Sequence, residues 1–523
     1  MHTRSGLIRY SPADLLEFLA SPFATWMSRF ALDHPALAQP DPDPPELTVL
    51  AERGRQHEQA CLEQFRRAGR DIYVPPEGAV RTGATVAAMR SGREVIYQGR
   101  LAHDAVHGSF IGQPDFLVRT DGTSDLGEYH YEVWDAKLAH HPSPDFLIQL
   151  CCYVDLLTVV QARHPEYVCL LVGSGEQPRF RTANYIYYYG ALKQGFLEFL
   201  QHFDPEQQPA PELGGSYGCW SSAAARLLDA ADHLSRVANV TVGQIKKLNA
   251  AGITTLQALA ETRLAHVPKL DDAVLARLKE QAYLQLVSTD TERPTYRILI
   301  PESSQPVRGL GLLPSASPGD VFFDMEGYPL VEGGLEYLFG AVSIHNDAVM
   351  FNDWWAHNAD EERRAFSDFV DWVYARWRVD PSMHIYHYAN YEIAALRRLM
   401  GRYGSREAEV DMLLRREVFV DLYTIVQQGL RVGEPHYSIK NLEHLYRPRR
   451  SGDVTSAIDS IVAYTRWLES GEPGDWSVSP LLQAIRVYNR DDCESTWQLA
   501  TWLRERQREA GIVWSPKHES QDE

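Results

Sequence analysis

The sequence predicts a multidomain α/β protein in which two mixed segments are joined by a small helical one. The chain has 523 residues, which is too long for one ordinary hydrophobic core, so two or three domains are expected. Helical patterns and strand-like runs are mixed in both outer segments, whereas the middle segment carries short helical patterns alone. We therefore expect domains over residues 1–228, 229–295 and 296–523.

Composition and charge limit the function classes. The formal net charge of −19 argues against a protein that coats nucleic acid, because phosphate binding relies on Lys and Arg, but it permits an enzyme that holds phosphates through metal ions. No run approaches the ~20 apolar residues of a membrane span, and the N-terminal residues lack a signal-peptide pattern. We expect a cytoplasmic protein with no membrane partner. The six cysteines form no CxxC pair, which favours reduced thiols. The sequence contains no GxxxxGK[ST] phosphate loop, so we expect no ATP motor in this chain.

The first segment has an α/β texture. Two stretches have helical spacing, SPADLLEFLASPFATWMSRF (residues 11–30) and ERGRQHEQACLEQFRRAG (52–69). Three runs look like strands: GSFIGQPDFLVR (108–119), YHYEVWDAKLA (129–139) and NYIYYY (184–189).

Two of these strand-like runs carry a carboxylate pair beside a lysine. Asp115 lies in the first run, and Asp135 and Lys137 lie on one face of the next, because side chains alternate along a strand. This combination suits phosphodiester cleavage, in which negative charge grows on oxygens that are already anionic. Three further candidates accompany them: His57 on the upstream helix, and Gln149 and Tyr153, one helical turn apart.

The middle segment is helical and has short loops. In VGQIKKLNAAGITTLQALA (residues 242–260) two helical patterns meet at Gly252, where a glycine lets backbone N–H groups approach a phosphate. Lys246 and Lys247 add positive charge. The stretch 269–286 resembles a second, more degenerate copy. Either a nucleic-acid contact or a plain spacer fits this pattern.

The third segment opens with an apolar run that ends in two acids, VFFDMEG (residues 321–327). If this run is a strand, Asp324 and Glu326 point to one side, and Phe323 and Met325 point to the other. Two carboxylates on one face repel each other unless a cation lies between them.

Further acids follow on separate predicted elements. Glu392 lies near the start of a helical pattern after HIYHY, and Tyr488 and Asp492 lie four residues apart on a late amphipathic helix, hence on one face. Four acids from three elements offer the hard oxygen ligands that Mg²⁺ or Mn²⁺ prefers.

The order of these motifs resembles the DEDD exonucleases of the ribonuclease H-like fold, in their tyrosine-bearing (DEDDy) variety, over residues 319–505. The resemblance implies a mixed-sheet 3′-5′ exonuclease domain in which the four acids hold two divalent ions. It also implies that Tyr488 orients the attacking water or helps to deprotonate it. The second acid of this family is usually Asp, whereas here it is Glu392, so Asp421 in FVDLYTIV is a substitute or supporting candidate.

The first constellation resembles the RecB-like branch of the PD-(D/E)XK nucleases, which have a restriction-endonuclease-like core. That resemblance implies that Lys137 positions water and stabilises the transition state, while Gln149 and Tyr153 brace the site or the nucleic acid. The implied ligands of one or two Mg²⁺ or Mn²⁺ ions are His57, Asp115 and Asp135.

Many relatives in this branch hold an iron–sulfur cluster through one cysteine near the N-terminus and three after the nuclease core. Here Ser21 stands at the first position and only Cys219 remains of the later three, so we expect no cluster. Because these cluster cysteines are missing, an alternative stays open: the first domain is a DNA-binding or structural module, and only the C-terminal site is catalytic.

The order of parts along the chain resembles RecB-like nucleases that join a PD-(D/E)XK domain, a helix-hairpin-helix bridge and a YprB-type ribonuclease H-like domain. Stretches such as DHLSRVANV, YSIKNLEHLY and YNRDDCEST carry this resemblance. It implies a substrate of DNA, single-stranded or with free ends, with RNA as the second candidate. Because longer relatives append a helicase, it also implies a helicase partner in trans. A non-catalytic interaction protein is the rival that 12 tryptophans and 26 tyrosines suggest.

Overall fold

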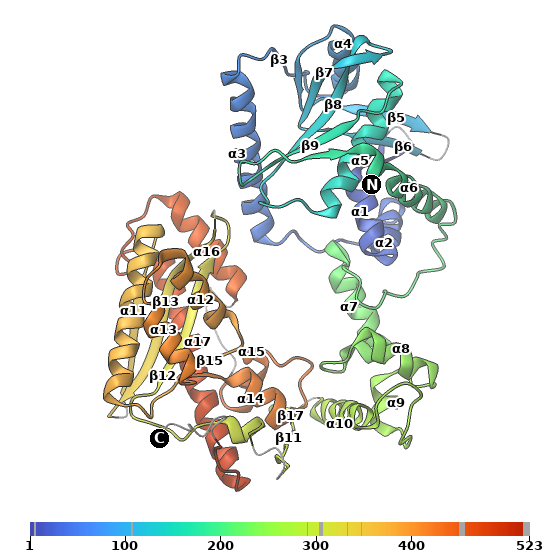
Figure 1. The fold of residues 1–523 in the computed structure, drawn as a ribbon. Coiled ribbons are helices and arrows are strands. Elements are labelled where there is room, and N and C mark those ends of the chain that lie inside the picture. Colours follow the sequence, from blue (N-terminus) through green and yellow to red (C-terminus); the bar gives the residue numbers. More distant parts are fainter. Residues whose placement is uncertain are drawn as a thin grey trace. The chain divides into compact units, whose positions relative to one another are not determined.

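The computed structural model describes residues 1–515 apart from 5–6, 106–107, 290, 303–306, 332, 347 and 449–455. It is a mixed α/β protein that divides into two compact units, Met1–Ala230 and Ala231–Glu523 (Figure 1). Each unit has hydrophobic clusters of its own. The helical segment that the sequence separates as residues 229–295 falls almost entirely within the second unit.

The first unit contains two sheets. The larger has the strand order β10-β9-β8-β7-β4-β3, with β7 antiparallel to β8 and β9 parallel to β8. The smaller has the order β1-β2-β6-β5. The strands are β1 (His2–Arg4), β2 (Leu7–Tyr10), β3 (Ile72–Tyr73), β4 (Val95–Tyr97), β5 (Leu101–Ala105), β6 (Gly108–Gly112), β7 (Phe116–Ser124), β8 (Gly127–Lys137), β9 (Tyr167–Val172) and β10 (Arg179–Arg181).

Helices surround these sheets, and α5 contributes most to the core between them. By length and composition α5 is also the one helix among the described residues that could cross a membrane, but half of it is buried inside the unit, as in many core helices of soluble proteins. The helices are α1 (Pro12–Ala20), α2 (Pro22–Asp33), α3 (Pro45–Arg67), α4 (Arg81–Arg90), α5 (Pro144–Gln161), α6 (Ile186–Gln201) and α7 (Ser221–Ala230), with 3-10 turns η1 (Thr182–Asn184) and η2 (Gly218–Trp220).

Three expected elements of this unit differ in the structure. The stretch 11–30 forms two helices, because Ser21 ends α1 and caps α2 ahead of Pro22. The run 108–119 is divided between β6 and β7, which belong to different sheets. The run 184–189 was expected to be a strand, which is wrong: Asn184 ends η1, and residues 186–189 open α6. The apolar spacing of α6 continues to Gln201, and packing overrides the strand preference of its tyrosines.

The second unit begins with the short helices of the predicted bridge. They are α8 (Val242–Ala250), α9 (Leu256–Glu261) and α10 (Asp272–Ser288), preceded by the 3-10 turn η3 (Leu234–Arg236). A two-stranded antiparallel sheet of β11 (Tyr296–Ile298) and β17 (Leu430–Val432) lies beside α10 (Figure 1). The buried Gln281 side chain of α10 donates to the carbonyl of Val432 (2.8 Å) and accepts from the Tyr437 hydroxyl (2.9 Å). These bonds attach the bridge to the C-terminal domain.

A five-stranded mixed sheet organises the rest of the unit, in the order β14-β13-β12-β15-β16. The central strand β12 is antiparallel to β13 and parallel to β15. The strands are β12 (Val321–Tyr328), β13 (Leu335–His345), β14 (Ala348–Trp355), β15 (Ile385–His387) and β16 (Phe419–Asp421).

Helices cover both faces of this sheet (Figure 1). On one face α11 packs against β12, where Phe323 stacks on Phe369 with 4.2 Å between ring centroids. The neighbouring Phe322 belongs to the opposite core, which includes α17. Alternation along β12 therefore turns Asp324 and Glu326 toward α17. The helices are α11 (Ala359–Val379), α12 (Tyr391–Tyr403), α13 (Glu407–Arg415), α14 (Leu422–Gly429), α15 (Ile439–Leu442), α16 (Ala457–Ser470) and α17 (Pro480–Glu509), with 3-10 turns η4 (Gly309–Leu312) and η5 (Glu443–Leu445).

Candidate active site

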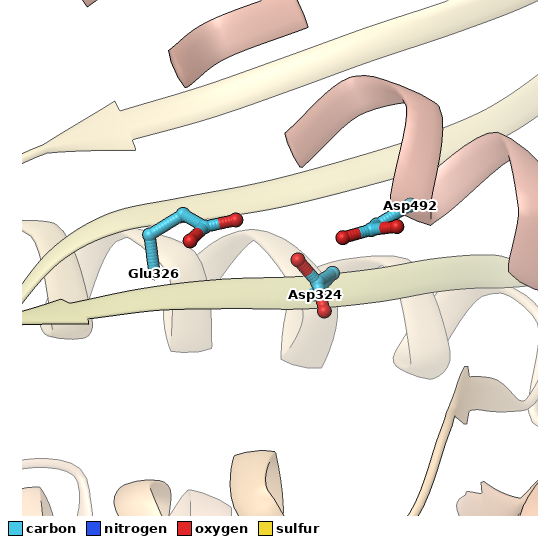
Figure 2. Close-up of side chains that lie close together, drawn as sticks. All are labelled: Asp324, Glu326 and Asp492. Atoms are coloured by element: carbon cyan, nitrogen blue, oxygen red, sulfur yellow. The ribbon is translucent and has the colours of Figure 1, made fainter. Parts of the chain in front are cut away.

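Three carboxylates meet between β12 and α17. Asp324 and Glu326 project from the strand, and Asp492 reaches toward them from the helix (Figure 2). One oxygen of each carboxylate lies within 4.8 Å of the other two, and no other group of three or more His, Cys, Asp or Glu side chains does so among the described residues. Their oxygen donors fit Mg²⁺ or Mn²⁺, so this cluster could bind metal.

A glycine on the neighbouring strand makes room for this arrangement. Gly340 on β13 is the register partner of Asp324, and a Cβ atom there would lie 1.7 Å from Oδ1 of Asn489 on α17. Without that Cβ, the Asn489 amide reaches the strand and donates from Nδ2 to Asp324 Oδ2 (2.8 Å) and to Glu326 Oε1 (3.4 Å). Asn489 therefore fixes the orientation of both strand carboxylates.

Burial makes the ionised form of Glu326 costly. Burial raises the pKa of Glu326 to about 8, and repulsion from Asp492 adds to that effect. Hydrogen bonds from the Ser460 hydroxyl (2.8 Å) and from Asn489 lower this pKa, and so does the positive charge of Lys440. A divalent cation between Glu326 and Asp492 would remove the repulsion, because it favours both ionised carboxylates.

Tyr488 lies one helical turn before Asp492 and is 6% exposed. Burial raises the pKa of its phenol, and the charges of Asp492, Glu326 and Asp324 raise it further. The ammonium of Lys440 lies 5.2 Å from the centroid of its ring. At neutral pH the phenol therefore keeps its proton and acts as a hydrogen-bonding group.

The three carboxylates open into a cavity of about 620 Å³ between the sheet and the helices. Tyr488 and Glu392 line the same cavity, so the fourth predicted acid faces the other three. Glu392 lies in the first turn of α12 and is 3% exposed, and burial raises the pKa of its carboxyl. Its Oε2 lies 3.6 Å from Nδ1 of His387 and forms no hydrogen bond with a described residue.

Asp421, the alternative to Glu392, lies outside this cavity. Its carboxylate caps α14, accepting from the backbone N–H of Tyr423 (2.9 Å) and the hydroxyl of Thr424 (2.6 Å). It also accepts from the N–H of Ala389 (2.9 Å), a residue with a φ of 69° in the turn before α12. Asp421 thus holds the turn that presents Glu392.

Further residues at the cavity were not singled out from the sequence. Arg398 lines it and pairs with the buried Glu336, whose Oε2 also accepts from the Tyr391 hydroxyl (2.9 Å). The Arg398 side chain is 43% exposed, and Glu336, which lines the same cavity, balances its charge. The seven-residue spacing of Tyr391 and Arg398 on one helix face is the signal that could have found them. For Asn489 the sequence carries no such signal beyond its place next to Tyr488.

The first unit brings its predicted acids together at the paired ends of β7 and β8. Asp115 directly precedes β7, its Oδ2 accepts from the N–H of Ala136 (2.8 Å), and its own N–H donates to Asp135 Oδ1 (3.4 Å). Nζ of Lys137 lies 2.7 Å from Asp135 Oδ2.

From Lys137 a chain of hydrogen bonds reaches α5. The ammonium donates to Gln149 Oε1 (2.9 Å), and Gln149 Nε2 donates to the Tyr153 hydroxyl (2.8 Å). The spacing of these three residues in the sequence therefore corresponds to one connected network.

Among the described residues, His57 forms no hydrogen bond with this network. Its Nε2 lies 2.8 Å from the carbonyl of Leu171, and it is not grouped with Asp115 and Asp135 within 4.8 Å. The next residue, Glu58, is an acid that sequence reasoning missed. Burial and the charge of Asp135 raise the pKa of Asp115 well above its ordinary value, and Glu58 contributes to the same effect.

Ser21 takes part in a link between two distant parts of the first unit. Its buried hydroxyl caps α2 and donates to Glu212 Oε2 (2.7 Å), and Glu212 also accepts from the N–H of Phe23 (2.6 Å). Cys219 follows in the turn before α7, with a partly buried thiol. Glu212 therefore joins the start of α2 to the segment that leads to Cys219.

In the bridge, Gly252 occupies the turn between α8 and α9 with a φ of 82°, a conformation that favours glycine. Apart from its chain neighbours, no heavy atom of the described residues lies within 4 Å of where its Cβ would be, so there is open space beside this turn. Lys246 is exposed and Lys247 is half-buried.

Comparison with known proteins bears on the C-terminal domain. Residues 321–504 match the family model of the RNase H superfamily, a stretch that begins with β12 and contains all four acids and Tyr488. This supports an RNase H-like domain, and RNase H-like nucleases use divalent metals. No curated protein and no solved structure matches the chain.

Proposed function

We propose that the chain is a metal-dependent nuclease that hydrolyses phosphodiester bonds in the cavity between β12 and α17. The observation that carries this proposal is the approach of Asp324, Glu326 and Asp492 to within 4.8 Å in a cavity that Glu392 and Tyr488 also line. The RNase H superfamily match over the same residues supports it.

Each residue has a distinct role in this proposal. The acids hold two divalent ions, and such ions stabilise the attacking and leaving oxygens of a phosphodiester. Asn489 orients Asp324 and Glu326, while Tyr488, as a neutral phenol, orients the attacking water. We assign the reaction to a DEDDy exonuclease that acts 3′-5′ on DNA, with RNA as the second substrate candidate.

A second nuclease site of the PD-(D/E)XK type is proposed for the first unit. It is supported by the contact of Lys137 with Asp135 and by the network through Gln149 and Tyr153. The place of His57 beside Leu171 favours the alternative, in which the unit binds DNA or serves as a scaffold without cleaving. The proposal also includes a helix-hairpin-helix bridge between the two nuclease domains. It further includes a helicase that acts as a partner in trans, and a cytoplasmic location.

End-labelled single- and double-stranded DNA and RNA provide the test. We expect the full chain to release nucleotides with Mg²⁺ or Mn²⁺ and to release none in EDTA. Asp492→Asn should abolish the stepwise products, and Lys137→Ala should remove a different product pattern if the first site cleaves.

The outcomes separate the alternatives. If Lys137→Ala changes nothing while Asp492→Asn abolishes all cleavage, the first unit is not a nuclease. Absence of metal-dependent cleavage of every substrate would contradict the proposal as a whole.

A further inference from the structure

The small sheet of the second unit places two like charges opposite each other. In the antiparallel register of β11 and β17, Arg297 on one strand is the direct partner of Arg431 on the other. Like charges at directly opposed positions destabilise a sheet. An arrangement of this kind calls for an anion nearby.

Helix α10 lies beside this sheet (Figure 1). A groove of about 620 Å³ lies between the helix and the strands. It is separate from the cavity between β12 and α17, with which it shares no lining residue. The charged residues that line the groove are Arg277, Lys279, Arg297, Arg431 and Glu280.

One carboxylate leaves this set of four cations with an excess of positive charge. Glu280 pairs with Arg297 and lies 3.6 Å from Nε of Arg431. That Nε is buried and finds no hydrogen-bond acceptor among the described residues. This local excess of positive charge contrasts with the net charge of −19 of the whole chain.

Arg277 shows the excess most clearly. It lies one turn before Glu280 on α10, yet no ion pair joins it to a carboxylate in the described part of the chain. Burial lowers the pKa of its guanidinium, and repulsion from Arg431 lowers it further. Burial and Arg431 therefore both disfavour the charge of Arg277, and a bound anion would offset them.

An exposed aromatic ring accompanies the cations. Tyr283 lines the groove and is 54% exposed. Proteins that bind single-stranded nucleic acid without sequence preference combine positive grooves, which follow the phosphates, with aromatic rings, on which bases stack. The groove contains both components.

We propose that this groove binds the phosphodiester backbone of a single-stranded nucleic acid, with Arg277 and Lys279 on phosphates and Tyr283 stacked on a base. The choice of ligand rests on the proposed nuclease function. The groove then holds a part of the strand away from the residues that cleave it.

Binding of a fluorescein-labelled single-stranded oligonucleotide to the full chain in EDTA tests the proposal by fluorescence anisotropy. We expect Arg277→Gln/Lys279→Gln to weaken binding and to lower the slope of log affinity against log salt by about 0.7 for each lost phosphate contact. The matched control is Arg363→Gln/Arg378→Gln, which removes two exposed charges from α11 and should bind as the wild type does.

Two further readouts distinguish binding from a structural role. Because Arg277 is repelled by Arg431, its removal should leave the melting temperature of the metal-free protein unchanged or raised, whereas a structural arginine would lower it. In the cleavage assay the double variant should raise KM and leave kcat unchanged. Tyr283→Ala should weaken binding about tenfold without changing the salt slope.

The outcomes also separate this inference from the proposed function. If the wild type binds and cleaves the strand while both groove variants bind as the control does, the groove inference alone is overturned. If the wild type neither binds nor cleaves any nucleic acid, the inference and the proposed function fall together.

Discussion

Replacing Glu326 by glutamine should stabilise the metal-free protein at alkaline pH. The carboxyl is buried, and its pKa rises from an ordinary value of 4.5 to about 8. For an acid raised in this way, the contribution to stability is fully present below the unfolded value and is lost as the pH rises through the folded value. The metal-free wild type should therefore lose stability between about pH 4.5 and pH 8.

The size of the effect follows from the same two values. One pKa unit corresponds to about 1.4 kcal/mol, so the difference in stability amounts to on the order of 5 kcal/mol above pH 8. For a unit of this size, that corresponds to a melting temperature higher by roughly 10 °C in Glu326→Gln than in the wild type. The amide can still accept from Ser460, so the hydrogen bond need not be lost.

Differential scanning calorimetry in EDTA between pH 4 and pH 9 measures this difference. Glu407→Gln, which removes an exposed carboxylate on α13, is the matched control and should follow the wild type at every pH. Adding Mn²⁺ should reverse the order, because a bound metal stabilises the folded state and the variant has lost a ligand. A variant that melts below the wild type at pH 9 in EDTA, or with the same pH dependence, would refute the reasoning.

Further substitutions test other parts of the site. Tyr488→Phe should keep Mn²⁺ affinity in calorimetry but slow cleavage by about 10²- to 10⁴-fold, because it removes a water-orienting group; an unchanged rate would contradict that role. Gly340→Ala should lower the melting temperature, since overpacking costs about 1–3 kcal/mol, and should reduce cleavage by displacing Asn489. The purified protein should be colourless and free of iron, given Ser21 and the single Cys219; stoichiometric iron with broad visible absorbance would refute this.

Strand alternation explains what could be read from the sequence at the C-terminal site. The two-residue spacing of Asp324 and Glu326 dictates a shared face, and the four-residue spacing of Tyr488 and Asp492 dictates a shared side of the helix. Both relations are local, so they survive whatever the tertiary fold does. Glu392 could be placed only through the resemblance, and the structure has it in the same cavity.

The features of the site that could not be predicted from the sequence depend on contacts between distant segments. Gly340 lies opposite Asp324 only because β13 pairs with β12 in one register, and Asn489 reaches the acids only because that glycine leaves space. Arg297 and Arg431 are 134 positions apart and face each other across two short strands. The strand prediction for residues 184–189 was wrong for the same reason, since the packing of α6, and not local propensity, decides their conformation.

The rate of Mn²⁺-dependent cleavage of a 3′-labelled single strand, compared between Asp492→Asn and Asp491→Asn, tests the central claim most directly. The two substitutions remove the same charge from adjacent residues of α17, but Asp492 belongs to the carboxylate cluster, whereas Asp491 pairs with Arg447. We predict that Asp492→Asn abolishes stepwise cleavage and that Asp491→Asn cleaves at close to the wild-type rate. Equal rates for the two variants would contradict a metal-dependent nuclease site between β12 and α17.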